Sequence, residues 1–357
     1  MNKRRFQFFM FVSLLIVTLL AVSSVGAAPK DGPVVTLSTA QTEFSASQDV
    51  LVTVTYTNPT GHSVRILQWF TPANGLEEPV FDVKVNGEPV AYIGAIYKRP
   101  AATGNDFMTL KAGQNVSYSV NLGEYYDLTA TGQYEIYYKA ASFYLYSEKG
   151  NGLSNPDYLV SAPISLKVDG RVAKGGKPTP PPPPPPGGTS YDACTVTQQV
   201  ILVDARNQAK TYATTSMNYL PGVKDPGTER YLEWFGVFTT SRYNTVSSHY
   251  AALTNAWTNA GVTFHCGCKQ NYYAYVYPDR PYEIWLCRVF WTAPLAGTDS
   301  QGGTLIHEMS HFTVVASTDD YVYGQSGARN LADTNPDQAI MNADNHEYFA
   351  ENNPYKP

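Results

Sequence analysis

The chain has 357 residues, of which 43% are hydrophobic and 15% are charged, and its formal net charge is -5 at pH 7. These values are typical of folded globular proteins and exclude a largely disordered chain. Lys and Arg are not clustered as they are in nucleic-acid-binding proteins, so we expect no nucleic-acid partner. The length predicts about two domains together with segments that are removed by processing.

The N-terminus has the three parts of a secretory signal peptide. Basic residues at 3–5 precede an apolar run at 6–20, and small residues follow at 25–27. The apolar run is shorter than the roughly 20 residues of a membrane-spanning helix. We therefore predict a signal peptide at 1–27 and a secreted, extracellular protein with no membrane attachment after its removal. An uncleaved anchor is the alternative.

Residues 28–172 are predicted to form an all-β, Ig-like sandwich. Short runs rich in β-branched and aromatic residues are separated by turn sequences such as Asn86-Gly87. The runs lie at 34–37, 50–54, 81–85, 116–120 and 134–138. No group of catalytic residues is found among them. Asn115 begins an Asn-Val-Ser sequence, which would be glycosylated only in a eukaryotic host.

A linker rich in Gly and Pro is predicted at residues 173–190. Its prolines are unbroken from Pro180 to Pro186. Consecutive prolines adopt an extended polyproline helix, which cannot join a packed core. The segment therefore indicates a spacer between two independent units.

Residues 191–357 are predicted to form an α+β domain, because helical and strand-like patterns alternate along them. Helical patterns lie at 200–217 and 247–259, and strand-like runs lie at 262–268, 272–277 and 283–291. A further helix follows, and it carries the main motif of the chain.

The four cysteines of the chain, Cys194, Cys266, Cys268 and Cys287, all lie in this second domain. In a secreted protein an even number of cysteines favours disulfides. Cys266 and Cys268 are too close in sequence to pair comfortably, which leaves two pairings open. We favour Cys194 with Cys266 and Cys268 with Cys287. A metal site at the Cys-Gly-Cys sequence is a weaker alternative, because better zinc ligands lie elsewhere.

The sequence His-Glu-Met-Ser-His begins at His307 and fits the pattern H-E-x-x-H. His307 and His311 are four residues apart, so on a helix their imidazoles lie on one face and can bind one metal ion. Glu308 is rotated around the helix, where it can reach a water molecule at the metal without being a ligand. A catalytic zinc ion needs three protein ligands and one open position. By itself the motif also fits an amphipathic helix with histidines on its polar face.

The sequence that follows resembles the second motif of the aspzincins, the deuterolysin family of zinc metalloendopeptidases. That motif is G-T-x-D-x-x-Y-G. Thr318, Asp320, Tyr323 and Gly324 match it, and Ser317 stands in place of the first Gly. The resemblance implies a zincin-like catalytic domain that holds one zinc ion.

The resemblance also implies the roles of individual residues. Asp320 would be the third zinc ligand beside His307 and His311. Glu308 would act as the general base, and Tyr323 would donate a hydrogen bond to the developing oxyanion.

Residues 191–357 are most similar to one branch of the family, the peptidyl-Lys metalloendopeptidases. The segment 342–349 resembles the part of that branch that forms an acidic S1′ pocket, in which Asp344 and Glu347 would bind a Lys ammonium. A solvated helix face is the alternative for these two carboxylates. The cysteine spacing resembles the two disulfides of the branch, which supports the favoured pairing.

The remaining histidines of this domain, His249, His265 and His346, are not expected to bind metal. His346 lies in the pocket segment, where it either orients a carboxylate or has no special role.

These features predict an endopeptidase that acts on proteins or peptides at the amino side of Lys and is made as a precursor. The resemblance implies that the N-terminal domain is a propeptide, acting as an inhibitor or a chaperone. The predicted sandwich also permits an accessory domain that is retained as a binding module. Lys174 and Lys177 offer sites for self-cleavage before the prolines. The alternatives are a broad-specificity protease like deuterolysin and a non-catalytic, secreted zinc-binding adhesion protein. The presence of Glu308 and Tyr323 favours an enzyme.

Overall fold

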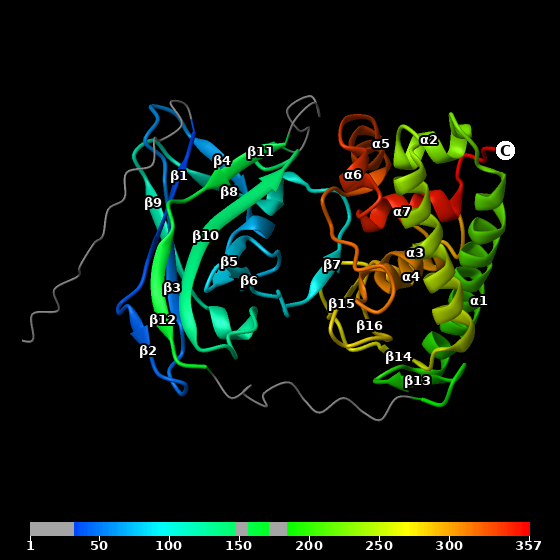
Figure 1. Ribbon diagram of the computed structural model, residues 1–357, viewed down its shortest axis with the longest axis horizontal. Coiled ribbons are helices and arrows are strands. Elements are labelled where there is room, and N and C mark those ends of the chain that lie inside the picture. The colour runs from blue at the N-terminus through cyan, green and yellow to red at the C-terminus, as the bar shows by residue number, and fades with distance from the viewer. Residues whose placement is uncertain (1–31, 148–155, 171–183) are drawn as a thin grey trace, which may run out of the picture.

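A computed structural model describes residues 32–147, 156–170 and 184–357. The predicted signal peptide at 1–27 and the two lysines at 174 and 177 lie outside these residues. Figure 1 shows a β-rich N-terminal part beside a helix-rich C-terminal part, with the short strand β7 between them. Among the residues described, no helix is both long enough and apolar enough to span a membrane.

The N-terminal part consists of short strands, as its alternating sequence predicts. In β3, Val52, Val54 and Tyr56 are buried, and the residues between them are more exposed, because successive side chains of a strand point to opposite faces. The strands are β1 (Val34–Ser38), β2 (Glu43–Phe44), β3 (Leu51–Thr57), β4 (Val64–Leu67), β5 (Phe81–Val85), β6 (Glu88–Pro89), β7 (Ile96–Lys98), β8 (Phe107–Leu110), β9 (Asn115–Asn121), β10 (Gly132–Ser142), β11 (Asp157–Val160) and β12 (Ile164–Val168).

These strands pair in the orders β1-β3-β9 and β2-β12-β10-β5-β6, with β11 on β10, while β4 pairs with β8. The pairings are antiparallel except that of β2 with β12. The buried side chains of these sheets form one apolar cluster, which includes Tyr56, Tyr134 and Tyr138. This part therefore has a core of its own.

The C-terminal part combines helices with one mixed sheet, in agreement with the α+β prediction. Its elements are β13 (Thr189–Asp192), α1 (Val196–Tyr219), α2 (Glu229–Phe235), α3 (Thr240–Asn259), β14 (Val262–His265), β15 (Ala274–Val276), β16 (Glu283–Leu286), α4 (Gln301–His311), α5 (Gly324–Thr334), α6 (Pro336–Ala339) and α7 (Ala343–Glu351). Strand β13 begins inside the predicted linker. The strand predicted at 283–291 ends at Leu286, and residues 290–292 form a 3-10 turn that buries Phe290.

The sheet of the C-terminal part has the order β13-β14-β16-β15-β7. The pairs β13–β14 and β14–β16 are parallel, whereas β15 runs antiparallel to both β16 and β7. Strand β7 belongs by sequence to the N-terminal part, so the sheet is completed by a strand from outside its own domain. The sequence patterns did not predict that a strand of the N-terminal part would join this sheet.

Both favoured disulfides are present. Cys194 bonds to Cys266 and joins the ends of the parallel neighbours β13 and β14. Cys268 bonds to Cys287 and joins the next loop to the end of β16. The described chain has no free cysteine, so the Cys-Gly-Cys metal site is excluded.

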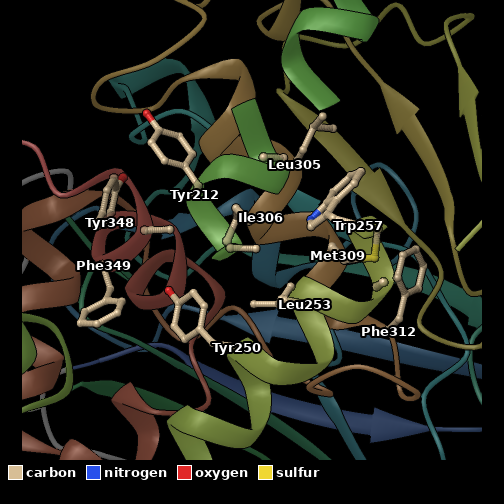
Figure 2. Packing of buried hydrophobic residues seen from close by; sticks show 14 of the residues in the cluster. Tyr212, Tyr250, Leu253, Trp257, Leu305, Ile306, Met309, Phe312, Tyr348 and Phe349 are labelled. Atoms are coloured by element: carbon tan, nitrogen blue, oxygen red, sulfur yellow. The ribbon is translucent and has the colours of Figure 1, made fainter. Parts of the chain in front are cut away.

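Helix α4 lies at the centre of the C-terminal part, and all of its residues are buried. In Figure 2, Ile306 of this helix lies toward Tyr250 of α3, and Leu305 and Met309 lie on the side of Trp257 and Leu253; all belong to one buried apolar cluster. Ser300 caps the N-terminus of the helix, because its side chain accepts a hydrogen bond from the Gly303 amide.

Gly303 is required by the close approach of α7 to α4. A Cβ atom at this position would lie 2.0 Å from Oε1 of Glu351 and 2.9 Å from Oε1 of Glu347. The buried helices α4 and α7 thus meet with carboxylates in their interface, directly before the histidine motif.

Candidate active site

His307, Glu308 and His311 project from the buried helix α4. The rings of His307 and His311 lie 4.8 Å apart between centroids, as expected for side chains one helical turn apart. All three residues are excluded from solvent. The helix prediction and the shared face of the two histidines are therefore confirmed.

Asp320 reaches the two histidines from the loop that follows α4. Its Oδ1 atom lies 3.2 Å from Nε2 of His307 and 3.6 Å from Nε2 of His311. The loop is held in place by Thr318, whose hydroxyl lies 2.6 Å from that of Ser310. The two histidines and Asp320 form a group whose candidate ligand atoms lie within 4.8 Å of one another.

The three atoms that could bind a metal ion are buried and lack hydrogen-bond partners, although they lie within ion-pair distance of one another. They are Nε2 of His307, Nε2 of His311 and Oδ1 of Asp320. Unpaired buried polar atoms are costly, and a cation among them would satisfy all three. Two imidazole nitrogens and one carboxylate oxygen also match the three-ligand set of a catalytic zinc site. The residues present therefore fit zinc.

The tautomer of His311 fits metal binding. Its Nδ1 atom lies 2.9 Å from the backbone oxygen of Thr318 and donates to it, which leaves the Nε2 lone pair free toward Asp320. Burial lowers the pKa of His311 to about 4. The ring is therefore neutral at physiological pH, which is the form that binds a metal ion.

Glu308 is not a member of the donor group, and both of its carboxylate oxygens are buried without a hydrogen-bond partner. Burial raises the pKa of Glu308 to about 8; Asp320 acts in the same direction, and His307 opposes the rise. A carboxylate with a raised pKa beside a candidate metal site is typical of a proton-transfer group.

Tyr323 lies on the other side of Asp320, in contact with the N-terminal part. Its hydroxyl lies 3.2 Å from Oδ2 of Asp320, 2.9 Å from the backbone oxygen of Tyr97 and 3.1 Å from Oε1 of Glu78. It also accepts a hydrogen bond from Arg99 at 2.9 Å. A phenol has one proton to donate, so these three oxygen acceptors compete for it.

Asp344 and Glu347 lie on α7 and are almost completely buried. The alternative prediction, that they lie on a solvated helix face, is therefore wrong. Asp344 Oδ1 lies 2.8 Å from Nδ1 of His307. The ammonium of Lys98 lies 2.6 Å from Oε2 of Glu347 and 3.2 Å from Oδ1 of Asp344. Burial alone would raise the pKa of Asp344, but Lys98 and His307 hold it below its usual range. The two carboxylates thus form a buried cation site beside the histidine group.

The cysteines and the other histidines are not members of the group that could hold a metal ion. His265 lies between Asp192 and Glu283, at 2.9 and 3.0 Å, and its ring stacks on Trp285. His249 and His346 pair with each other. The Nδ1 atom of His346 donates to the Asn342 backbone oxygen at 3.0 Å, so His346 does not orient a pocket carboxylate.

Sequence reasoning missed the residues that the N-terminal part contributes to the site. They are Glu78, Tyr97, Lys98 and Arg99. No local pattern distinguishes Lys98 from the other lysines of that part. Asp299, which lies 3.6 Å from the Lys98 ammonium, was also missed.

Comparison with known proteins identifies the family of the chain. A family model described as Lysine-specific metallo-endopeptidase, of the aspzincin family, matches residues 222–351. An extracellular protease of Aeromonas hydrophila is 42% identical over 316 residues, which are 87% of this chain and 90% of that protein. A peptidyl-Lys metalloendopeptidase of Grifola frondosa is 33% identical over 357 residues, which are 97% of this chain and 99% of that protein.

Two further matches are confined to one part of the chain. A peptidyl-Lys metalloendopeptidase of Pleurotus ostreatus is 52% identical over 166 residues, which are 46% of this chain and 98% of that protein. A solved structure of a zinc peptidase from Grifola frondosa is 46% identical, with a TM-score of 0.44, and covers 46% of this chain and 100% of that chain. The chain belongs to the aspzincin family and is a zinc metalloendopeptidase related to the peptidyl-Lys metalloendopeptidases.

Proposed function

We propose that this chain is a secreted zinc endopeptidase that hydrolyses protein or peptide substrates on the amino side of Lys and is made as a precursor. The observation that carries the proposal is the Lys98 ammonium between the carboxylates of Asp344 and Glu347. These carboxylates adjoin His307, which belongs to the candidate metal site. A lysine side chain therefore has a place to bind directly beside the reacting centre.

The lining of this pocket favours lysine over other side chains. The Lys98 ammonium lies 5.1 Å from the centre of the Tyr273 ring and 5.8 Å from that of Tyr348. Aromatic faces and two carboxylates stabilise a compact charge at the end of a long apolar stem. A neutral side chain would leave the carboxylates buried without a counterion, which costs several kcal/mol.

In this proposal His307, His311 and Asp320 hold the zinc ion. Zinc bound there supplies Lewis acidity, which lowers the pKa of a water molecule to roughly 7 and polarises the scissile carbonyl. Glu308 accepts a proton from the attacking water and passes it to the leaving amine. Tyr323 donates a hydrogen bond to the oxygen that becomes negative in the transition state.

The domain organisation is part of the proposal. Residues 1–27 would be a signal peptide, 28–172 an Ig-like propeptide that inhibits the enzyme, 173–190 a linker and 191–357 the catalytic domain. The all-β content and separate core of the N-terminal part support a separate domain at 28–172. Two disulfides support an oxidising, extracellular location.

Digestion of an unstructured protein tests the proposed specificity. The processed enzyme is incubated with reduced and alkylated casein, with and without a zinc chelator, and every new N-terminus is sequenced by mass spectrometry. Chelator-sensitive products that begin almost wholly with Lys are expected. Mixed N-termini would favour a broad-specificity protease like deuterolysin, and no cleavage by a zinc-loaded sample would favour the non-catalytic adhesion protein.

A further inference from the structure

Strand β7 and the residue after it cross the candidate active site. We propose that residues 96–99 bind there as a substrate does, with the peptide bond between Tyr97 and Lys98 in the position of the bond that is cleaved, so that the N-terminal part inhibits the precursor through its own lysine. This inference rests on the proposed Lys specificity and names the occupant of the pocket in the precursor.

The backbone of β7 is held as an added strand. It runs antiparallel to β15, with Tyr97 opposite Tyr275 and Lys98 opposite Ala274. The Tyr273 amide donates a hydrogen bond to the Lys98 backbone oxygen at 3.0 Å. Addition of an extended segment to an exposed sheet edge is a common way to bind peptides, because main-chain hydrogen bonds fix the register and pockets select side chains. The register places the Lys98 side chain in the acidic pocket.

Side chains of β7 point alternately toward the pocket and away from it. The Lys98 side chain is only 1% exposed and faces the carboxylates of α7. Tyr97 points to the other face, where its ring lies 5.4 Å from that of Tyr272 and 5.1 Å from that of Tyr275. An ammonium is thus buried in the pocket, while its neighbour is fixed by aromatic contacts on the opposite face.

The carbonyl before Lys98 lies at the reacting centre. Its oxygen, that of Tyr97, accepts a hydrogen bond from the Tyr323 hydroxyl at 2.9 Å. The same hydroxyl lies 3.2 Å from Oδ2 of Asp320, the proposed zinc ligand. For an enzyme that cuts on the amino side of Lys, the scissile carbonyl is the one that precedes Lys. The pocket contact and the carbonyl contact therefore identify the same peptide bond.

Arg99 fixes the strand on the other side of this bond. It forms an ion pair with Glu78, and its second amino group donates to the Glu77 backbone oxygen at 3.0 Å. Its guanidinium lies 5.0 Å from the centre of the Trp69 ring. Because Oε1 of Glu78 also lies 3.1 Å from the Tyr323 hydroxyl, it competes with the Tyr97 carbonyl for the single phenol proton. The N-terminal part thus holds both the strand and the residue proposed to assist its cleavage.

These contacts make the bond a poor substrate. Hydrolysis would add one water molecule and leave a carboxylate on Tyr97 and an amine on Lys98. Both new ends would stay in place, Tyr97 through the sheet and Lys98 through the pocket, so re-formation of the bond would compete with release. The strand therefore blocks the active site instead of leaving it.

Hydrolysis by the uncut precursor tests the inhibition. The full chain, loaded with zinc and shown by gel to be intact during the measurement, is assayed on a fluorogenic peptide with one Lys. We expect Lys98→Ala to raise the initial rate at least about tenfold, because its loss removes the cation that fills the pocket. Lys139→Ala, at an exposed position of β10, should leave the rate unchanged. A folded, zinc-loaded Lys98→Ala precursor as inactive as the wild type would overturn the inference.

A second measurement needs no variant, so it remains informative if Lys98→Ala does not fold. Lysines of the wild-type precursor are acetylated under native conditions and followed by mass spectrometry. Lys98 should react at least about ten times more slowly than Lys139, since buried groups are shielded from the reagent. Equal rates would mean that Lys98 is not in the pocket.

The two proposals can fail separately. Lys-specific digestion by the processed enzyme together with an inactive Lys98→Ala precursor would contradict the inference and leave the function standing. Mixed N-termini together with activation by Lys98→Ala would contradict the specificity and leave the inhibition standing.

Discussion

Lys98 and Glu347 form a buried ion pair of 2.6 Å between the N-terminal part and the last helix of the chain. The carboxylate is completely excluded from solvent. A buried charge that loses its partner costs several kcal/mol, so this pair defines what the pocket must bind.

The first prediction concerns this carboxylate in the processed enzyme. Glu347→Gln should lower kcat/KM for a peptide with Lys after the scissile bond about 100-fold, because the loss of one charge from a buried pair costs roughly 2–5 kcal/mol. A matched peptide with a neutral residue at that position should lose much less. Glu229→Gln, the same change at an exposed site, is the control. An equal loss for both peptides would show that Glu347 does not select Lys.

The second prediction separates metal binding from proton transfer. Asp320→Asn should weaken zinc binding more than about 100-fold, beyond the 10–100-fold effects typical of residues that only orient ligands. Asp319→Asn should retain zinc, because its carboxylate lies outside the donor group. Zinc content after dialysis against a weak chelator measures both. Wild-type zinc content in Asp320→Asn would mean that the third ligand lies elsewhere.

Glu308→Ala should behave differently from the ligand variants. It should keep zinc and lower kcat by about 10²–10⁴, the usual contribution of a general base. Zinc content and kcat are measured on the same sample of processed enzyme. An active Glu308→Ala enzyme would remove Glu308 from the mechanism.

The third prediction concerns the hydroxyl of Tyr323. Tyr323→Phe should lower kcat by about 10²–10³ without loss of zinc, because one donor to the oxyanion is removed. Tyr321→Phe, two residues earlier, serves as the control because the Tyr321 side chain is partly buried against the apolar cluster that contains Val322. An unchanged kcat in Tyr323→Phe would mean that Tyr323 does not donate a hydrogen bond to the oxyanion.

Some of the site could be predicted from the sequence because it depends on local geometry. The positions of His307 and His311 follow from the helical repeat alone. Asp320 lies beyond a turn, and only the family motif identified it. The turn contains Ser317, at the place of the motif's first Gly, with a φ of 52°. This left-handed conformation explains the Gly of the motif, and Ser adopts it at a cost of roughly 1–2 kcal/mol.

The contribution of the N-terminal part could not be predicted in this way. Lys98 and Asp344 are 246 residues apart in the sequence. Strand β7 has only three residues and pairs with a strand of the other part, so its partner is set by tertiary packing. The proposed lysine specificity implies a lysine side chain in the pocket, but nothing local in the sequence selects Lys98. A strand that one part adds to the sheet of the other leaves no periodic pattern in the sequence.

The last prediction concerns the buried pair His249 and His346, whose Nδ1 and Nε2 atoms lie 3.0 Å apart. His346 donates from Nδ1 to the Asn342 backbone oxygen, so its Nε2 atom accepts from His249. This arrangement requires a neutral His346, since a proton on its Nε2 would oppose the one on His249. Burial lowers the pKa of His249 to about 4 and that of His346 to about 3.

Both pKa values lie below the roughly 6.5 of an unfolded histidine, so the unfolded chain binds more protons between pH 6.5 and about 3 to 4. Their contribution to the free energy of unfolding is therefore complete above pH 6.5 and falls as the pH is lowered, by roughly 2–3 kcal/mol for each imidazole between pH 6.5 and 4.5. Urea unfolding of the zinc-saturated protein between pH 7 and 4.5 measures this slope. His249→Gln keeps a donor for His346 without titrating, so it should flatten the slope, whereas His62→Gln, at an exposed position, should not. Equal slopes for His249→Gln and the wild type would mean that His249 is protonated in the folded protein.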